Sequence, residues 1–383
     1  AETGRPTMIA VKTVIGFGSP KKAGTASAHG SPLGAEEIAA ARQQLGWPHP
    51  ACEMPDDILD ACRTAGRRGA VDYAAWDAKW AELDAAKRGA FEGPMNGDIR
   101  AAVSAAIQAH KQAIADGGET KATRVWSQLA IEALLPVVPG LAGGSADLTG
   151  SNNTLGAGQP VVKRGEFGGS YIHFGVREHG MAAALNGMAL YGGLIPYGGT
   201  FLVFTDYCRP SLRLAALMGL RTVYVMTHDS IGLGEDGPTH QPVEHVASLR
   251  AVPNLQVFRP ACGIETAECW ELAVTSETTP SVLALTRQGV VNGRGAGAEN
   301  RCARGGYLLS GDAPGRDLTI IATGSEVGLA LQAAEELGKL GKHAAVVSMP
   351  CIELFREQDL AYQQQTLGDK PRIVVEAGVR MGW

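Results

Sequence analysis

The sequence predicts an α/β protein built on doubly wound parallel sheets. Strand patterns and helix patterns alternate from Thr120 to Arg287, and the alternation starts again at Asp317. The candidate strands are short apolar runs rich in β-branched residues, and glycine, proline or polar residues bound them. The 50 glycines and the aromatic content of 6% suit a fold with many close helix–strand junctions. Repeated β-then-α units imply that ligands bind near the carboxyl ends of the strands.

The first part of the chain has a different pattern. The apolar run Thr7–Ile15 predicts a buried strand, and a glycine-rich loop that contains His29 follows it. A helix is predicted for 35–45. From Pro55 to Gly118 the sequence is rich in alanine and charged residues, and we expect a helical connector that packs on a neighbour.

The alternating region supplies most of the predicted elements. Its strands are expected in LAGGSADL, YIHFG, LIPYGGTF, RTVYVMTHD, LQVFRPA and SVLALTR. Its helices are expected at 121–135, 177–191, 203–218, 241–250 and 264–276. A second α/β unit is expected from the strands DLTIIATG, HAAVVSMP and RIVVEAG, with a helix at 325–338 between the first two.

Composition excludes several classes of protein. The net charge of −5 argues against binding to nucleic acid or to a membrane surface, which would need a basic excess. The seven cysteines are scattered and never spaced as C-x-x-C, so neither a disulfide framework nor a zinc site is indicated. No apolar run approaches the ~20 residues that span a bilayer. A cytoplasmic location is the expectation.

Both ends of the sequence have the pattern of strands from a sheet interior. A domain rarely opens on an interior strand such as Thr7–Ile15, and the predicted strand in PRIVVEAG is followed by no helix before Trp383. We therefore expect the chain to be cut from a longer polypeptide at both ends.

The string THDSIGLGEDGPTHQPVEH, Thr227 to His245, carries the densest chemistry. His228 and Asp229 come directly after a predicted strand. A glycine-rich loop follows, and further acidic residues and His240 come before the next predicted helix. Any one of these residues could cap a turn or face solvent. The whole string indicates a binding loop at the carboxyl end of a parallel strand.

This string closely resembles the substrate loop of transketolases. GGSADLTGSN (143–152), YIHFGVREHGM (171–181) and GTFLVFTDY (199–207) match the same family in order and approximate spacing. The resemblance covers nearly the whole chain. It implies the tail of a diphosphate-binding domain with a helical connector at 1–118, a pyrimidine-binding domain at 119–304, and the first part of the C-terminal α/β domain at 305–383.

The resemblance also implies thiamine diphosphate as the cofactor. Glu178 matches the acid that hydrogen-bonds a nitrogen of the aminopyrimidine ring, which promotes loss of the thiazolium C2 proton. Phe204 matches the ring that stacks on the aminopyrimidine, with Phe201 and Tyr207 beside it. Without the resemblance, aromatic residues at this helical spacing would more often belong to the hydrophobic core than to a cofactor site. Asp147 matches a position near the thiazolium.

Substrate-binding residues follow from the same resemblance. The implied partners of the substrate phosphate are Arg124, Ser151, His228 and Arg287. Arginine suits phosphate because its planar fork donates two hydrogen bonds at once. Asp236 and His240 match positions that contact ketose hydroxyls, and His29 matches a histidine near the cofactor and the transferred carbon. We count Glu178, His240 and His29 as the catalytic group.

Two departures from the family pattern are expected to matter. Ala26 stands where transketolases often carry an additional histidine, which should weaken substrate handling. The family's GDG motif and following asparagine, which hold Mg²⁺ and the diphosphate, are absent from the sequence, so no metal ligand is assigned in this chain. The Mg²⁺ ligands are expected on a segment that precedes Thr7.

The predicted activity is reversible transfer of a two-carbon ketol (glycolaldehyde) unit from a ketose phosphate to an aldose phosphate. It would serve the pentose phosphate pathway or the Calvin cycle, in a homodimer whose active site lies between subunits. We expect the chain to be inactive alone. The alternatives are dihydroxyacetone synthase, deoxyxylulose-phosphate synthase, or a non-catalytic half that docks with a separate diphosphate-binding subunit. The string His228-Asp229-Ser230 disfavours the second.

Overall fold

The computed structural model describes residue 4 and residues 7–311 and 315–383. The chain forms two compact units, Ala1–Asp84 and Ala85–Trp383. The division falls well before residue 118, where the sequence suggested a boundary, because helix α5 (Arg100–Gly117) packs on α6 (Thr123–Leu134) and α11 (Gly263–Thr275).

The first unit is helical among its described residues. It contains η1 (Ala26–Ala28), α1 (Ala35–Gln44), α2 (Asp56–Gly66), η2 (Arg67–Gly69) and α3 (Ala70–Glu82). The predicted buried strand Thr7–Ile15 is wrong: this stretch joins no sheet in the part of the chain that the structure describes, and Met8 is 91% exposed. A strand needs a neighbour for its backbone groups, and the described residues of this unit supply none.

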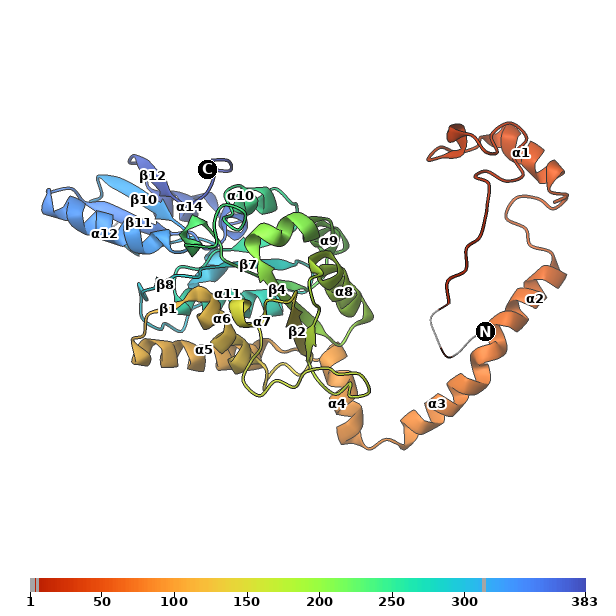
Figure 1. The fold of residues 1–383 in the computed structure, drawn as a ribbon, viewed down its shortest axis with the longest axis horizontal. Coiled ribbons are helices and arrows are strands. Elements are labelled where there is room, and N and C mark those ends of the chain that lie inside the picture. The colour runs from red at the N-terminus through yellow and green to blue at the C-terminus, as the bar shows by residue number, and fades with distance from the viewer. Residues whose placement is uncertain (1–3, 5–6, 312–314) are drawn as a thin grey trace. The chain divides into compact units, whose positions relative to one another are not determined.

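The second unit is built on a parallel six-stranded sheet (Figure 1). The strand order is β3-β2-β4-β5-β7-β6. The strands are β2 (Leu141–Ser145), β3 (Tyr171–His173), β4 (Ile195–Phe201), β5 (Val223–Thr227), β6 (Gln256–Phe258) and β7 (Ser281–Leu285). From β3 the chain passes over β2 to reach β4, so the order reverses between β2 and β4. This reversal point is where doubly wound sheets bind ligands.

Helices cover both faces of this sheet. Helices α5, α6 and α11 cover one face, and α8 (Glu178–Tyr191), α9 (Thr205–Met218) and α10 (His245–Arg250) cover the other. Strand β5 serves both cores, because Val225 packs into the first and Met226 into the second. Burial on both faces explains why the predicted strands are nearly continuous apolar runs. The helix predicted at 241–250 begins only at His245.

A four-stranded sheet follows in the order β12-β10-β11-β9. Its strands are β9 (Tyr307–Ser310), β10 (Leu318–Ala322), β11 (Ala344–Ser348) and β12 (Arg372–Val375). Strand β9 pairs antiparallel with β11 and was not predicted. The helices here are α12 (Glu326–Lys339), α13 (Ile352–Arg356) and α14 (Leu360–Leu367). The short elements α4 (Ala85–Asn96), α7 (Thr149–Asn152), β1 (Lys121–Ala122) and β8 (Gly289–Val290) complete the unit, together with η3 (Leu202–Phe204), η4 (Ile231–Leu233) and η5 (Arg301–Arg304).

Buried charges join the two sheets. Arg259, directly after β6, is fully buried and donates to Asp229 Oδ2 at 2.9 Å and to Thr323 Oγ1 at 2.8 Å; it also bonds Glu326 at the start of α12. Nearby, Arg250 donates two hydrogen bonds of 2.8 Å to Glu376, which follows β12. Except for Arg250, the last residue of α10, these groups follow strands of the two sheets at their carboxyl ends. They fix one sheet against the other.

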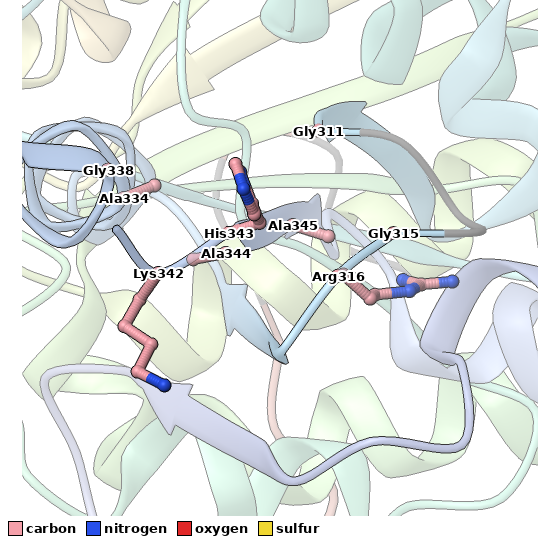
Figure 2. A pocket seen from close by; sticks show the side chains of 9 residues that line it. All are labelled: Gly311, Gly315, Arg316, Ala334, Gly338, Lys342, His343, Ala344 and Ala345. Atoms are coloured by element: carbon pink, nitrogen blue, oxygen red, sulfur yellow. The ribbon is translucent and has the colours of Figure 1, made fainter. Parts of the chain in front are cut away.

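A pocket of about 400 Å³ opens beside α12 and β11 (Figure 2). It is lined by Arg316, Lys342 and His343, but Figure 2 shows the nitrogen-bearing ends of these side chains pointing in different directions. The Arg316 guanidinium donates to the carbonyl oxygens of Thr366 at 3.0 Å and Gln365 at 2.7 Å, at the end of α14. A cation there satisfies helix carbonyls, so Arg316 has a structural role.

Candidate active site

The residues with predicted roles follow the strands of the six-stranded sheet at its carboxyl edge. Asp147 comes after β2, Glu178 after β3, Phe204 after β4, His228 after β5 and Arg287 after β7. All these strands are parallel, so their carboxyl ends lie along one edge. The segments that the sequence predicted to converge therefore do so, because of the topology.

Aromatic rings form the centre of the site. Phe201 and Phe204 stack with ring centroids 5.7 Å apart, and Tyr207 lies 5.9 Å from Phe204. The His240 ring meets Phe204 edge-on at 5.4 Å. Phe201 is buried at the end of β4, whereas Phe204 is only half buried and Tyr207 is exposed. The ring of Phe204 is therefore partly accessible, and its stacking on a cofactor stays a prediction.

His228 lies behind these rings. Its ring centroid is 3.8 Å from that of Phe201, and its Nδ1 is 2.9 Å from Thr227 Oγ1. The backbone turns sharply here, since His228 has a φ of 58°, which residues other than glycine rarely adopt. Burial lowers the pKa of His228 to about 4, helped by the positive charge of Arg124 and opposed by Asp236. The imidazole is neutral at pH 7.

Two guanidinium groups lie close to His228. Arg124 donates to the carbonyl oxygen of Ser151 at 2.6 Å, and Arg287 donates to Glu235 at 2.7 Å. Burial lowers the pKa of Arg124, and the nearby charge of Arg287 lowers it further. The predicted phosphate-binding segments therefore meet, with Asp236 Oδ2 at 3.9 Å from His228 Nε2. Ser151 contributes its backbone carbonyl oxygen, which accepts the hydrogen bond from Arg124.

Glu178 is the first residue of α8, and its side chain is half buried. It faces α9: burial raises the pKa of Cys208 to about 12, and the negative charge of Glu178 contributes. Cys208 in turn donates to the carbonyl oxygen of Phe204 at 3.7 Å. A carboxyl group near the first turn of α9 and an aromatic ring just before that helix suit an aminopyrimidine, which needs stacking and one hydrogen bond to a ring nitrogen. The residues present fit the cofactor.

Two further predicted residues lie outside the contacts described above. Asp147 is exposed and has a φ of 64°, the left-handed conformation that a tight turn after a strand requires. His29 is exposed in the unit Ala1–Asp84. Their contacts with a cofactor remain predictions.

Sequence reasoning missed two groups in this part of the fold. Asn152 and Thr227 are fully buried and bonded to each other at 2.8 Å behind His228. His245 is buried, and its Nε2 lies 3.2 Å from Asp206 Oδ2. Asn152 and Thr227 stand inside the strings GGSADLTGSN and THDSIGLGEDG, so their positions could have been noticed, although residue type alone does not separate them from cap residues.

Searches for a metal site and for a membrane span were limited to the described part of the chain. Within residues 4, 7–311 and 315–383, no group of three or more His, Cys, Asp or Glu side chains is arranged to hold a metal ion. Over the same residues, no helix is both long and apolar enough to cross a membrane.

Three family models match the chain in succession. Residues 1–96 match the transketolase thiamine diphosphate binding domain, residues 119–291 the transketolase pyrimidine binding domain, and residues 305–383 the transketolase-like C-terminal domain. The transketolase of Cereibacter sphaeroides is 54% identical over 99% of this chain and 57% of its own length. The chain thus spans little more than half of that relative.

Solved structures agree with these matches. The transketolase from Leishmania mexicana superposes with a TM-score of 0.85 and 42% identity, over 97% of this chain and 55% of that one. A structure described as a split gene transketolase, inactive β4 tetramer, superposes with a TM-score of 0.54 and 26% identity, over 67% of this chain and 80% of that one. With three family models in the family's order and this identity along almost its whole length, the chain belongs to the transketolase family.

Proposed function

We propose that this chain supplies the pyrimidine-binding side of a transketolase active site. The reaction is reversible transfer of a glycolaldehyde unit from a ketose phosphate to an aldose phosphate. The observation that carries the proposal is the convergence of an aromatic face, a carboxyl group and two guanidinium groups along one sheet edge. Each is a group that this reaction needs, and they come from segments far apart in the sequence.

The residues then divide by role. Phe204, with Phe201 and Tyr207, holds the aminopyrimidine of thiamine diphosphate in register, which is catalysis by orientation. Glu178 holds a proton at the ring nitrogen. When bound, the cofactor supplies a carbanion-stabilising centre for cleavage and formation of the carbon–carbon bond. Asp147 is assigned to the thiazolium side of the cofactor.

The substrate is assigned to the polar part of the cluster. Arg124, Arg287, His228 and Ser151 bind its phosphate. The charge of Arg287 is close enough to lower the pKa of Arg124, a repulsion that a dianion between the two groups would relieve. Asp236 and His240 bind ketose hydroxyls, and His29 borders the transferred carbon. The division 1–118, 119–304 and 305–383 remains our proposal for the domains, although α5 packs with the second of them.

Further parts of the proposal concern what completes the site. Mg²⁺ and the diphosphate are held by residues outside this chain, and the active enzyme is a homodimer with its site between subunits. We assign it to the cytoplasm and to the pentose phosphate pathway or the Calvin cycle. Ala26 weakens substrate handling without abolishing the reaction. The relative that is called a split gene transketolase, inactive β4 tetramer, matches 67% of this chain and supports the view that the chain is inactive alone.

Complementation tests the function. The chain is mixed with the separately expressed N-terminal segment of the Cereibacter sphaeroides transketolase, thiamine diphosphate and Mg²⁺, and conversion of xylulose 5-phosphate with ribose 5-phosphate is measured. Activity should need both polypeptides, while the chain alone binds the cofactor weakly by calorimetry. Activity with pyruvate as donor instead would favour a deoxyxylulose-phosphate synthase, an alternative that the matched relatives do not favour. Tight Mg²⁺-dependent cofactor binding by the chain alone would contradict the partner requirement.

A further inference from the structure

A chain of buried hydrogen bonds runs across the sheet edge behind the site. It links three fully buried side chains, Ser145 at the end of β2, Asn152 at the end of α7 and Thr227 at the end of β5, to His228, which is 2% exposed. Polar side chains without solvent need fixed partners, because an unpaired group would cost about 1–3 kcal/mol. The donor and the acceptor of each hydrogen bond in this series can therefore be assigned in turn.

The first links orient Asn152. Ser145 Oγ donates to the carbonyl oxygen of Gly199 at 3.1 Å, and accepts from Asn152 Nδ2 at 3.2 Å. With its amide nitrogen used in this way, Asn152 presents Oδ1 to Thr227. Gly199 leaves the necessary space, since a Cβ atom there would lie 2.5 Å from Thr154 Cγ2 and 3.3 Å from Asn152 Nδ2.

The last links set the imidazole of His228. Thr227 Oγ1 donates its one proton to Asn152 Oδ1 at 2.8 Å. A hydroxyl has only one proton to give, so at 2.9 Å from His228 Nδ1 the same oxygen must accept. The proton of the neutral imidazole then lies on Nδ1, and Nε2 carries a free electron pair.

The groups around His228 favour this neutral form. Arg124 on α6, Arg287 after β7 and His240 on the substrate loop oppose a positive charge on the ring, and Asp236 alone favours one. Asp236 Oδ2 is 3.9 Å from Nε2, too far for a hydrogen bond. Nε2 thus lies toward Asp236, while Nδ1 is hydrogen-bonded to Thr227 at the end of β5.

We propose that Asn152 and Thr227 are positioning residues: they hold His228 with its proton on Nδ1, so that Nε2 faces the ligand site with a free electron pair that takes up a proton when the ligand binds. The identity of the ligand rests on the proposed function. A phosphate dianion between Arg124 and Arg287 offers Nε2 no proton, so its binding is accompanied by uptake of one proton from the acid form of the buffer, which is left as its conjugate base. A phosphate monoanion gives its own proton to Nε2 and is bound as the dianion.

The tautomer can be measured without any ligand. In the full chain labelled with ¹⁵N-histidine, long-range nitrogen–proton spectra at pH 7 distinguish a protonated Nδ1 from a protonated Nε2, and loss of the signals in His228→Gln identifies them. Wild type should show a single species with the proton on Nδ1. A proton on Nε2, as a reversed Asn152 amide would give, or an imidazolium overturns the proposal.

Substitutions test whether the buried hydrogen bonds fix the tautomer of His228. Thr227→Val removes the hydroxyl at nearly constant shape and should abolish the single-tautomer pattern, whereas Thr227→Ser should preserve it. Thr154→Val is the matched control, since it removes another fully buried hydroxyl, one bonded to Tyr171 at 2.7 Å. An unchanged tautomer in Thr227→Val overturns the positioning role, and the wild-type measurement holds even if that variant does not fold.

Addition of inorganic phosphate separates this proposal from the proposed function. The His228 signals should shift to those of an imidazolium, with loss of the free electron pair at Nε2. If the tautomer is as expected but phosphate changes nothing, His228 is withdrawn from the phosphate site and its proton uptake is overturned, while Asn152 and Thr227 keep their positioning role.

Discussion

The two larger sheets differ in how they use the polar residues at the carboxyl ends of their parallel strands. After β4, β5 and β7 of the larger sheet come Phe204, His228 and Arg287. His228 is buried, but Phe204 and Arg287 are only half buried; we call this the open edge. After β10 and β12 of the smaller sheet, the carboxylate of Glu326 is paired with Arg259 and that of Glu376 with Arg250; we call this the docking edge. Each edge lies where ligands usually bind α/β sheets.

The difference shows that the position of a charged residue at such an edge does not decide its function. The side chains of Arg250 and Glu376 are each 7% exposed and bond each other twice, so neither is available to a ligand. Arg287 has 35% of its side chain exposed and pairs with a Glu235 that is 76% exposed. Exchange of such an exposed pair for a phosphate costs little.

Loss of Glu178 should have the largest effect at the open edge. In an otherwise complete enzyme, Glu178→Ala is expected to lower kcat roughly 10²–10⁴-fold, the usual contribution of a positioned proton-holding group. Stability should change by only about 0.3–1 kcal/mol, since the carboxylate otherwise serves the first turn of α8. Steady-state kinetics and cofactor C2 proton exchange by NMR measure this. A normal exchange rate would show that the role is misassigned.

At the docking edge the effect should be on stability. Arg259→Met leaves Asp229 and Glu326 without their buried partner, which should cost about 3–5 kcal/mol of unfolding free energy. The matched control is Arg63→Met, which removes an exposed pair with Asp60 at 3.6 Å and should cost under about 0.5 kcal/mol. Urea denaturation followed by circular dichroism compares the two. Equal losses would refute the distinction between the edges.

Acid should weaken the docking edge in a defined range. Burial alone would raise the pKa of Glu376, but the hydrogen bonds and charge of Arg250 lower it to about 2 from its ordinary value of 4.5. The stabilisation, about 3 kcal/mol, is fully present above pH 4.5 and is lost as the pH falls toward 2. Denaturation at several pH values should show this slope, and Glu376→Gln should reduce it. An unchanged slope would mean that other acids cause it.

The smallest effect is expected for Arg287. If it binds phosphate in both ground and transition states, Arg287→Ala in the complete enzyme should mainly raise KM for a phosphorylated ketose. A charge-assisted hydrogen bond of roughly 1.5–3 kcal/mol corresponds to about ten- to a hundredfold. Hydroxypyruvate, a donor without phosphate, should be nearly unaffected. Equal losses with both donors would assign Arg287 to the fold.

The open edge could be anticipated from sequence, and the docking edge could not. The helix expected at 177–191 is Glu178–Tyr191, and the aromatic cluster lies where its string suggested. These features follow from local periodicity and from recognisable strings. Arg259 was not noticed, because a charged residue after a strand is usually exposed and its partners lie up to 67 residues away. The antiparallel edge strand β9 likewise depends on a distant neighbour.

The same dependence on neighbours explains the failure at Thr7–Ile15. Its apolar, β-branched residues have the local preference of a strand, but preference gives no structure without a partner for the backbone. The sequence pattern identified a segment suited to a sheet. It could not show that the described part of the unit Ala1–Asp84 holds no other strand to receive it.

That exposed stretch has a practical consequence for handling the protein. Met8, Ile9 and Val11 are 91%, 80% and 73% exposed, and Lys12 is the one charged residue between Thr7 and Ile15. Segments with high β-propensity, little charge and free backbone groups pair readily with copies of themselves and seed aggregates. Concentrated samples of this chain should therefore self-associate through residues 7–15, and a second charge there, as in Ile9→Lys, is the simplest remedy for preparation.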